Sequence, residues 1–234
     1  SADYIVTGVW AKKAYEEAAM LGDAKVAASS KETKFNQIPK TWNLNPNADY
    51  VHITTNNTIY GTEWKTLPET GNVPLVADMS SNFLSRPYDF GKCNLIYAGA
   101  QKNVGPSGVT IVVVKKSWME KANEKLPTML NYRTHIDNDS LFNTPPCLPI
   151  YAFHRTMKWI FKMGGLEAIQ KHNEKKAAYI YDIIDKYNDF YKGHVVVKED
   201  RSLMNISWNL PTPELEDKFV KEAKALNMVG LKGH

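Results

Sequence analysis

The chain has 234 residues, of which 43% are hydrophobic and 23% are charged, so it can bury one sizeable core or a core with part of a second domain. Its 29 lysines and arginines slightly outnumber its 25 acidic residues, and the basic residues are dispersed along the chain instead of forming a stripe, so nucleic acid is not indicated as a partner. No apolar run approaches the roughly 18 residues of a membrane span, so no membrane partner is expected either.

Short apolar runs recur through the first half of the chain. Asp3–Thr7 reads as a strand, and Trp10–Leu21 reads as an alanine-rich helix that Gly22 ends. Further strands are predicted at Lys25–Ala28, Tyr50–Thr54, Pro74–Asp78, Leu95–Ala98 and Val109–Val114. Most of these runs lack polar alternation, which is typical of strands that helices cover on both faces. The sequence therefore predicts an α/β fold with a mostly parallel sheet.

The character of the sequence changes after Pro149. Ile150–Met163 is predicted as a helix rich in aromatic residues, and Leu166–Tyr187 as a second helix after the glycine pair at 164 and 165. Two strands and a helix would then begin a small α+β domain; they are predicted at His194–Lys198, Leu203–Trp208 and Pro213–Leu226. We therefore expect a large domain over residues 1–163 and part of a small C-terminal domain over 164–234.

The two cysteines, Cys93 and Cys147, lie far apart in the sequence. Neither has the CxxC or histidine-rich spacing of a zinc site, so two free thiols are expected and no metal. The chain also opens without the basic and apolar stretches of a secretion signal. We expect a cytoplasmic protein.

A lysine and an aspartate stand at the ends of two predicted strands. Lys102 lies between the Leu95–Ala98 run and a glycine-rich turn, and Asp78 ends the Pro74–Asp78 run. A lysine in such a place costs desolvation free energy unless its charge is used or removed, and forming an imine with an aldehyde cofactor is one way to use it. Pyridoxal 5'-phosphate (PLP) needs such a lysine, and a carboxylate that keeps its ring nitrogen protonated. The alternatives are a surface lysine and a turn or helix-capping aspartate.

Five segments carry a resemblance to a known family. Asp78–Pro87 and Ile96–Pro106 closely resemble the phosphoserine aminotransferases, and Asp3–Trp10, Thr55–Gly61 and Phe142–Pro146 agree with that family in order. The resemblance covers essentially the whole chain, and its motifs are specific to this family among PLP enzymes. It implies a three-layer large domain of PLP-transferase fold type I, followed by the start of the small domain.

The resemblance also implies roles for single residues. Lys102 would hold PLP as an imine and shuttle the proton of the substrate, and Asp78 would pair with the ring nitrogen. Trp10 would stack on the cofactor ring, although a tryptophan at the start of a helix is by composition more often a core residue. Thr58 would donate a hydrogen bond to the phenolic oxygen, where an ordinary turn threonine would satisfy its own backbone. Gln101 would contact the phosphate.

Asn143 and Thr144 precede two prolines and by propensity would form an ordinary loop. The resemblance implies that they hold the phosphate of the cofactor bound to the neighbouring subunit. The site would then be shared across an obligate homodimer. Arg86 is a tempting carboxylate clamp, but it is expected to be structural because the clamps of the family lie elsewhere.

The implied reaction exchanges an amino group between O-phospho-L-serine and 2-oxoglutarate, with L-glutamate and 3-phosphonooxypyruvate as the other pair, in L-serine biosynthesis. The substrate-binding arginines and the phosphate loop of the family lie outside this sequence, so we expect a truncated chain. His234 aligns with a histidine that precedes one of those arginines.

Two other functions remain open at this point. One is a non-catalytic, PLP-binding core fragment. The other is a different fold type I enzyme, such as a desulfurase or an alanine–glyoxylate transaminase, which shares the aspartate and lysine but lacks the continuation from Asn103 to Gly108. A Rossmann dehydrogenase is disfavoured because no G-x-G-x-x-G follows a first strand.

Overall fold

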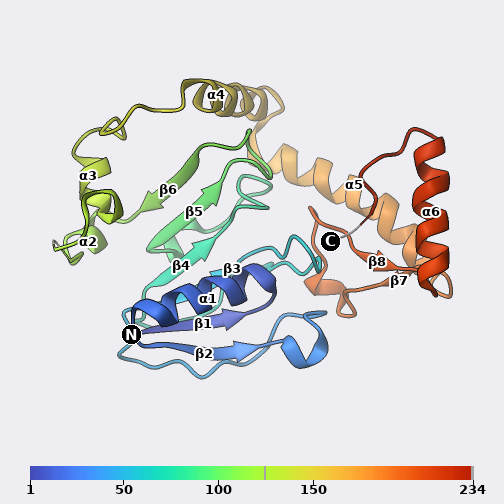
Figure 1. Cartoon of the computed structure of the whole chain (residues 1–234), viewed down its shortest axis with the longest axis horizontal. Coiled ribbons are helices and arrows are strands. Elements are labelled where there is room, and N and C mark those ends of the chain that lie inside the picture. Colours follow the sequence, from blue (N-terminus) through green and yellow to red (C-terminus); the bar gives the residue numbers. More distant parts are fainter. Residues whose placement is uncertain (124, 233–234) are drawn as a thin grey trace.

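The computed structural model describes residues 1–123 and 125–232, and its centre is a six-stranded sheet (Figure 1). The strand order is β2-β1-β3-β4-β5-β6. The strands are β1 (Ala2–Val6), β2 (Ala24–Ser29), β3 (Tyr50–Thr54), β4 (Leu75–Asp78), β5 (Leu95–Gly99) and β6 (Thr110–Val114). All neighbouring strands are parallel except β6, which is antiparallel to β5. The predicted α/β class with a mostly parallel sheet is therefore confirmed.

The two faces of the sheet have different coverings, because successive side chains of a strand point to opposite faces. One face holds a large buried cluster, against which Phe153 and Met157 of helix α4 (Cys147–Lys162) pack. The strand residues of that cluster include Ile5, Val51, Ile53, Leu75, Ala77, Ile96 and Ala98. The other face carries Tyr4 and lies under helix α1 (Val9–Leu21). Both coverings explain why the inner strands β1, β3, β4 and β5 are mostly apolar and buried.

The remaining helices are α2 (Lys116–Met119), α3 (Tyr132–Ile136), α5 (Gly165–Lys186) and α6 (Pro213–Ala225). Helix α5 begins after Gly164, which has a left-handed backbone (φ 100°) that glycine adopts without strain, and the predicted break between the two helices is confirmed there. From this turn α5 runs away from the sheet toward α6 (Figure 1). Among the residues that the structure describes, no helix is long and apolar enough to cross a membrane.

The prediction of strands at His194–Lys198 and Leu203–Trp208 is wrong. The strands that form there are two-residue pieces, β7 (Lys192–Gly193) and β8 (Trp208–Asn209). Between them the backbone bonds to loops beside the large sheet: Val196 N–H donates to the Asn36 carbonyl at 3.2 Å, and Ser202 N–H donates to the Gly61 carbonyl at 2.8 Å. Val195 is buried but Val196 is 62% exposed, and the hydrogen-bond partners of these runs lie far away in the sequence.

The buried face of β3 offers a direct test of the fold. Ile53 is fully buried, whereas Ile183 of α5 is 50% exposed. We expect Ile53→Ala to lower the free energy of unfolding by about 3 kcal/mol, because it leaves a cavity in the central strand. Ile183→Ala is the matched control and should change stability far less. Urea unfolding followed by circular dichroism measures both, and equal losses would contradict the central place of β3 in the core.

Candidate functional site

Four segments meet at the carboxyl edge of the parallel strands (Figure 1). β1 leads to Trp10 at the start of α1, β3 leads to the loop that contains Thr58, β4 ends at Asp78, and β5 leads to Lys102. Loops at this edge of an open α/β sheet are the usual place for a ligand. The topology thus gathers residues that are separated by up to 92 positions in the sequence, from Trp10 to Lys102.

Lys102 is the centre of this group. Its ammonium Nζ donates a hydrogen bond to Thr58 Oγ1 at 2.8 Å and lies 5.1 Å from the centroid of the Trp10 ring. The turn that carries it is closed by the backbone N–H groups of Val104 and Gly105, which donate to the Ala100 carbonyl. The structure therefore brings together three residues predicted to share a site.

Asp78 influences Lys102 through its charge. Its side chain is half-buried, and its Oδ1 accepts a hydrogen bond from Ser80 N–H at 2.9 Å, so the carboxylate also caps the turn that follows β4. The pKa of Lys102 is lowered, because protein atoms crowd its ammonium group; the carboxylate of Asp78 opposes this shift. The amine is solvent-accessible, so it can reach a ligand. A lysine with a lowered pKa has more of the neutral, nucleophilic form at a given pH.

Asn57 fixes the loop that carries Thr58. Its buried side-chain amide donates to the Thr7 carbonyl at the end of β1. A Cβ atom at Gly8 would overlap this amide, so the close approach requires glycine at that position. The contact ties the Thr58 loop to the turn directly before Trp10.

The remaining predicted residues are placed differently. Gln101 is exposed, and its side chain folds back over Gly99. Asn143 and Thr144 are exposed in the stretch between α3 and α4. Within the described ranges neither makes a hydrogen bond to Lys102, Thr58 or Trp10. His234 lies outside the described residues.

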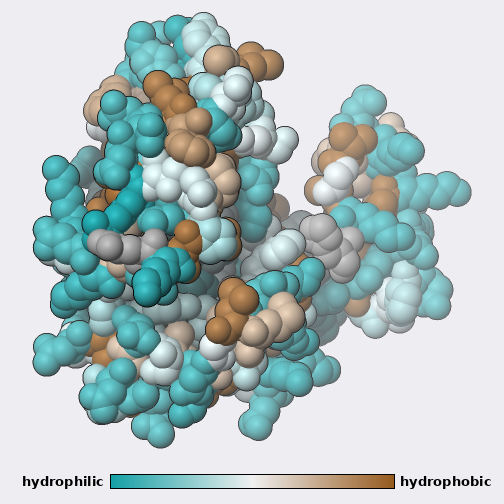
Figure 2. All heavy atoms as spheres, turned by 60° about the vertical axis from the view of Figure 1, so that its left-hand side comes forward, coloured by the Kyte–Doolittle hydropathy of each residue, from teal (hydrophilic) through white to brown (hydrophobic). Residues whose placement is uncertain are grey.

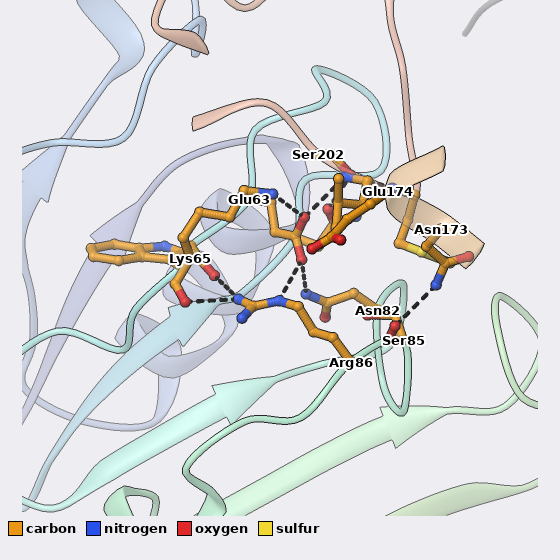
Figure 3. A network of polar contacts seen from close by, with 12 residues as sticks. Glu63, Lys65, Asn82, Ser85, Arg86, Asn173, Glu174 and Ser202 are labelled. Carbon is orange, nitrogen blue, oxygen red and sulfur yellow. Dashed lines mark hydrogen bonds and ion pairs between the residues drawn. The ribbon is translucent and has the colours of Figure 1, made fainter. Parts of the chain in front are cut away.

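A buried carboxylate beside this edge, Glu63, was missed by the sequence analysis (Figure 3). Its Oε1 accepts from Tyr88 Oη at 2.9 Å and from Asn82 Nδ2 at 3.2 Å, and lies 3.4 Å from Arg86 Nε. Its Oε2 accepts from Lys65 Nζ at 2.8 Å and from the backbone N–H of Leu203 at 3.0 Å. No spacing in the sequence indicates this cluster, because its members come from three distant segments.

The charge of Glu63 is well compensated. Burial by itself raises the pKa of this carboxyl, but Lys65, the Leu203 N–H and Arg86 outweigh burial and lower the pKa overall. Arg86 also donates to the carbonyls of Trp64 and Lys65 and lies 3.8 Å from the centroid of the Tyr88 ring. These contacts occupy its guanidinium, in line with the structural role expected for it.

Asn56 links the same loop to the C-terminal part of the chain. Its amide Nδ2 donates to Ser81 Oγ at 3.0 Å and to Asn205 Oδ1 at 2.7 Å, while its Oδ1 accepts from Ser202 Oγ at 2.5 Å. Asn56 thus holds the turn after Asp78 against the loop before Thr58 and joins both to the segment from Ser202 to Asn205.

A cavity of about 590 Å³ opens beside Thr58. The segment from Met204 to Leu210 and one face of α6 form its walls, and Phe219 and Val220 belong to that face. Lys102 does not line this cavity, so the cavity adjoins the Lys102 group only through Thr58. It leaves room for a ligand between the carboxyl edge and the C-terminal part.

Comparison with known proteins gives matches along the whole chain. Residues 1–233 match the aminotransferase class-V family. The chain is 53% identical over 235 residues to the phosphoserine aminotransferase of Lysinibacillus sphaericus and 50% identical to that of Herpetosiphon aurantiacus. These alignments cover 100% of this chain and 65% of each relative, so the chain spans about two thirds of their length.

Solved structures show the same similarity. Phosphoserine aminotransferase from Bacillus circulans subsp. alkalophilus superposes with a TM-score of 0.96 at 49% identity, over 100% of this chain and 65% of that one. A PLP-bound phosphoserine aminotransferase from Trichomonas vaginalis gives 0.92 at 33% identity, over 100% and 68%. A third structure, described as showing radiation damage of the Schiff base in phosphoserine aminotransferase, gives 0.95 at 51%, over 100% and 65%.

The electrostatic coupling between Asp78 and Lys102 can be tested without any ligand. Asp78→Asn removes the charge that raises the pKa of Lys102 but keeps an oxygen for the Ser80 N–H, so the pKa of Lys102 should fall further. We expect reductive methylation at pH 8 to be faster at Lys102 in this variant, measured by peptide mass mapping. Lys175, an exposed lysine of α5, serves as the internal control. Slower methylation of Lys102 would contradict the coupling.

Proposed function

Because the chain belongs to the class-V aminotransferase family, we propose that the protein containing it is a PLP-dependent phosphoserine transaminase. The observation that carries this proposal is the amine of Lys102, which lies against Thr58 and Trp10 with the Asp78 carboxylate near enough to influence its pKa. The two relatives that match the whole chain at 53% and 50% identity are phosphoserine aminotransferases. The reaction would exchange an amino group between O-phospho-L-serine and 2-oxoglutarate, in cytoplasmic L-serine biosynthesis.

The residues at the carboxyl edge fit PLP in their chemistry. Lys102 offers an amine for the aldehyde carbon, Asp78 offers a carboxylate for the ring nitrogen, and Thr58 offers a hydroxyl for the phenolic oxygen. The 41% exposed indole of Trp10 offers a flat surface for the ring. PLP, when bound, supplies an electron sink for the bonds at the amino carbon of the substrate.

Each residue would then have a defined task. The Lys102 amine, with its lowered pKa, would attack the aldehyde and later accept or return the proton at the substrate carbon. The Asp78 carboxylate, oriented by the Ser80 N–H, would hold a proton on the ring nitrogen. Thr58 would orient the phenolic oxygen, and Gln101, next to Lys102 in the turn, would contact the phosphate.

We also propose a homodimer with shared sites and a large domain that ends near Gly164. Asn143 and Thr144 would contact the phosphate of the cofactor in the partner subunit, which agrees with their exposure. Large hydrophobic side chains are exposed around them and on α4: Leu141, Phe142, Leu148, Tyr151, Trp159 and Phe161. Figure 2 shows hydrophobic atoms reaching the surface at several places on one face of the molecule. Apolar residues exposed in this number support burial against another subunit.

The activity is tested with the complete protein in which this chain occurs. Turnover with phosphoserine and 2-oxoglutarate should greatly exceed turnover with alanine or cysteine as amino donor. Lys102→Ala should abolish it, because the Lys102 amine is the one that contacts Thr58 and would carry the proton, whereas Lys115→Ala, an exposed lysine elsewhere, should not. Borohydride reduction should fix the cofactor to the peptide that contains Lys102. Labelling at another lysine would refute this site, and binding of PLP without turnover would identify a non-catalytic PLP-binding protein.

The shared site predicts complementation between subunits. Lys102→Ala and a double Asn143→Ala, Thr144→Ala variant should each be inactive as complete proteins. In a mixed dimer, one of the two sites would combine an intact Lys102 from one subunit with an intact Asn143 and Thr144 from the other, so activity should return. The measurement is phosphoserine transamination after the two variants are refolded together. Mixed dimers that form and stay inactive would show that the loop serves the site of its own subunit.

A further inference from the structure

His52 and Tyr97 lie on the same face of the sheet as Asp78. In the parallel register Asp78 lies opposite Tyr97 of β5, and Val76, two residues earlier, lies opposite His52 of β3. Residues two apart in a strand share a face, so His52, Asp78 and Tyr97 all project toward the side that α1 covers. β4 lies between β3 and β5, so any contact between His52 and Tyr97 passes over β4 (Figure 1).

Such a contact exists. His52 Nε2 and Tyr97 Oη are 2.9 Å apart, and the imidazole stacks on the Tyr4 ring with 4.8 Å between centroids and 26° between planes. The His52 side chain is 3% exposed. The ring is therefore held at one nitrogen and along its flat face, above the strand that ends at Asp78.

The imidazole is neutral at physiological pH. Burial lowers the pKa of His52 to about 4, although the Asp78 carboxylate raises it in part. Burial and the charge of Asp78 both raise the pKa of Tyr97, so the phenol keeps its proton. Tyr4, Tyr50 and Tyr132 also raise the pKa of Tyr97, and the hydroxyls of Tyr4 and Tyr50 are hydrogen-bonded to each other at 3.0 Å.

The hydrogen-bond inventory favours one tautomer. Within the described part of the chain, His52 Nδ1 has no partner, and the Tyr97 hydroxyl has only His52. If Nε2 carried the ring proton, the Tyr97 proton would have no acceptor and the Nδ1 lone pair no donor. If Tyr97 donates to Nε2, the ring proton of His52 must lie on Nδ1. Only the Nδ1–H then remains without a partner, and it is buried on the face of the sheet that also carries Asp78. A buried donor without an acceptor costs about 1–3 kcal/mol. Nδ1 makes no hydrogen bond to Asp78, so the carboxylate acts on this ring through its charge, which raises the pKa of His52 in part.

We propose that His52, fixed by Tyr97 as the neutral Nδ1–H tautomer, is a positioning residue for Asp78. Asp78 Oδ1 already accepts the Ser80 N–H, and the dipole of a buried N–H on the same face of the sheet would add to the field that acts on the carboxylate. This inference rests on the proposed function, because it assigns Asp78 the task of holding the proton on the cofactor ring. His52 itself would touch neither cofactor nor substrate.

The tautomer is tested in the chain without cofactor, by ¹⁵N NMR of the histidine rings. The chain has six histidines, so the His52 signals are identified by their loss in His52→Phe. We expect a protonated Nδ1, an unprotonated Nε2 and no titration between about pH 5.5 and 8, as for a pKa near 4. Tyr97→Phe should remove the preference for this tautomer, and Asp78→Asn should shift the Nδ1 signal. Tyr50→Phe, which removes a hydroxyl from the same face, is the control and should do neither.

Protonation at Nε2, or an Asp78→Asn spectrum that matches the Tyr50→Phe spectrum, would overturn the inference. A second measurement uses the complete protein with ¹⁵N-labelled PLP. His52→Phe should shift the signal of the PLP ring nitrogen and lower kcat about tenfold with little change in KM. Losses of this size are typical of residues that orient a functional group without touching the substrate. A ring-only packing role predicts lower thermal stability with an unchanged ring-nitrogen signal. Failure of the wild-type protein to bind PLP would refute the proposed function but leave the tautomer result standing.

Discussion

The parallel pairing of β1, β3, β4 and β5 is the constraint on which the candidate site depends. Parallel strands end at the same edge, so the four segments that follow them are forced together, whatever their separation in the sequence. The pairing also fixes side-chain directions: Asp78 and Tyr97 are opposite each other, and one slip in register would turn Asp78 toward the α4 side. Strands covered on both faces cannot slip in this way without exposing their apolar residues.

A buried carboxylate provides the second constraint. Glu63 has no contact with solvent, and burying an ionised group without partners would cost several kcal/mol. It is stable because five groups from three segments surround it (Figure 3). They are the cations of Lys65 and Arg86, the neutral donors of Asn82 and Tyr88, and the backbone N–H of Leu203. The same contacts determine how the loops of the candidate site lie relative to each other. A polar network of this kind specifies one arrangement, because a shifted loop would leave a charge unpaired.

Burial acts on the ionisable groups of the site in different ways. It lowers the pKa of Lys102 and of His52, and in both cases Asp78 works against it. For Lys102 the outcome is a lowered pKa at an exposed residue. For His52 the outcome is a buried, neutral ring. One carboxylate at a strand end thus influences the Lys102 amine and the buried His52 ring.

The sequence by itself determined the α/β class, all six strands of the large sheet and the helices around Trp10 and after Pro149, because these depend on local apolar runs. It also predicted that Lys102 and Asp78 share a site, because each belongs to a motif contained within one segment. It could not reveal Glu63 or the bond between His52 and Tyr97, whose partners are 45 or more positions apart or come from three segments. It also predicted strands at His194–Lys198 and Leu203–Trp208 where the backbone bonds to distant loops instead. Hydrophobic periodicity reports that a segment is buried, but only the tertiary structure decides which backbone and which charges it meets.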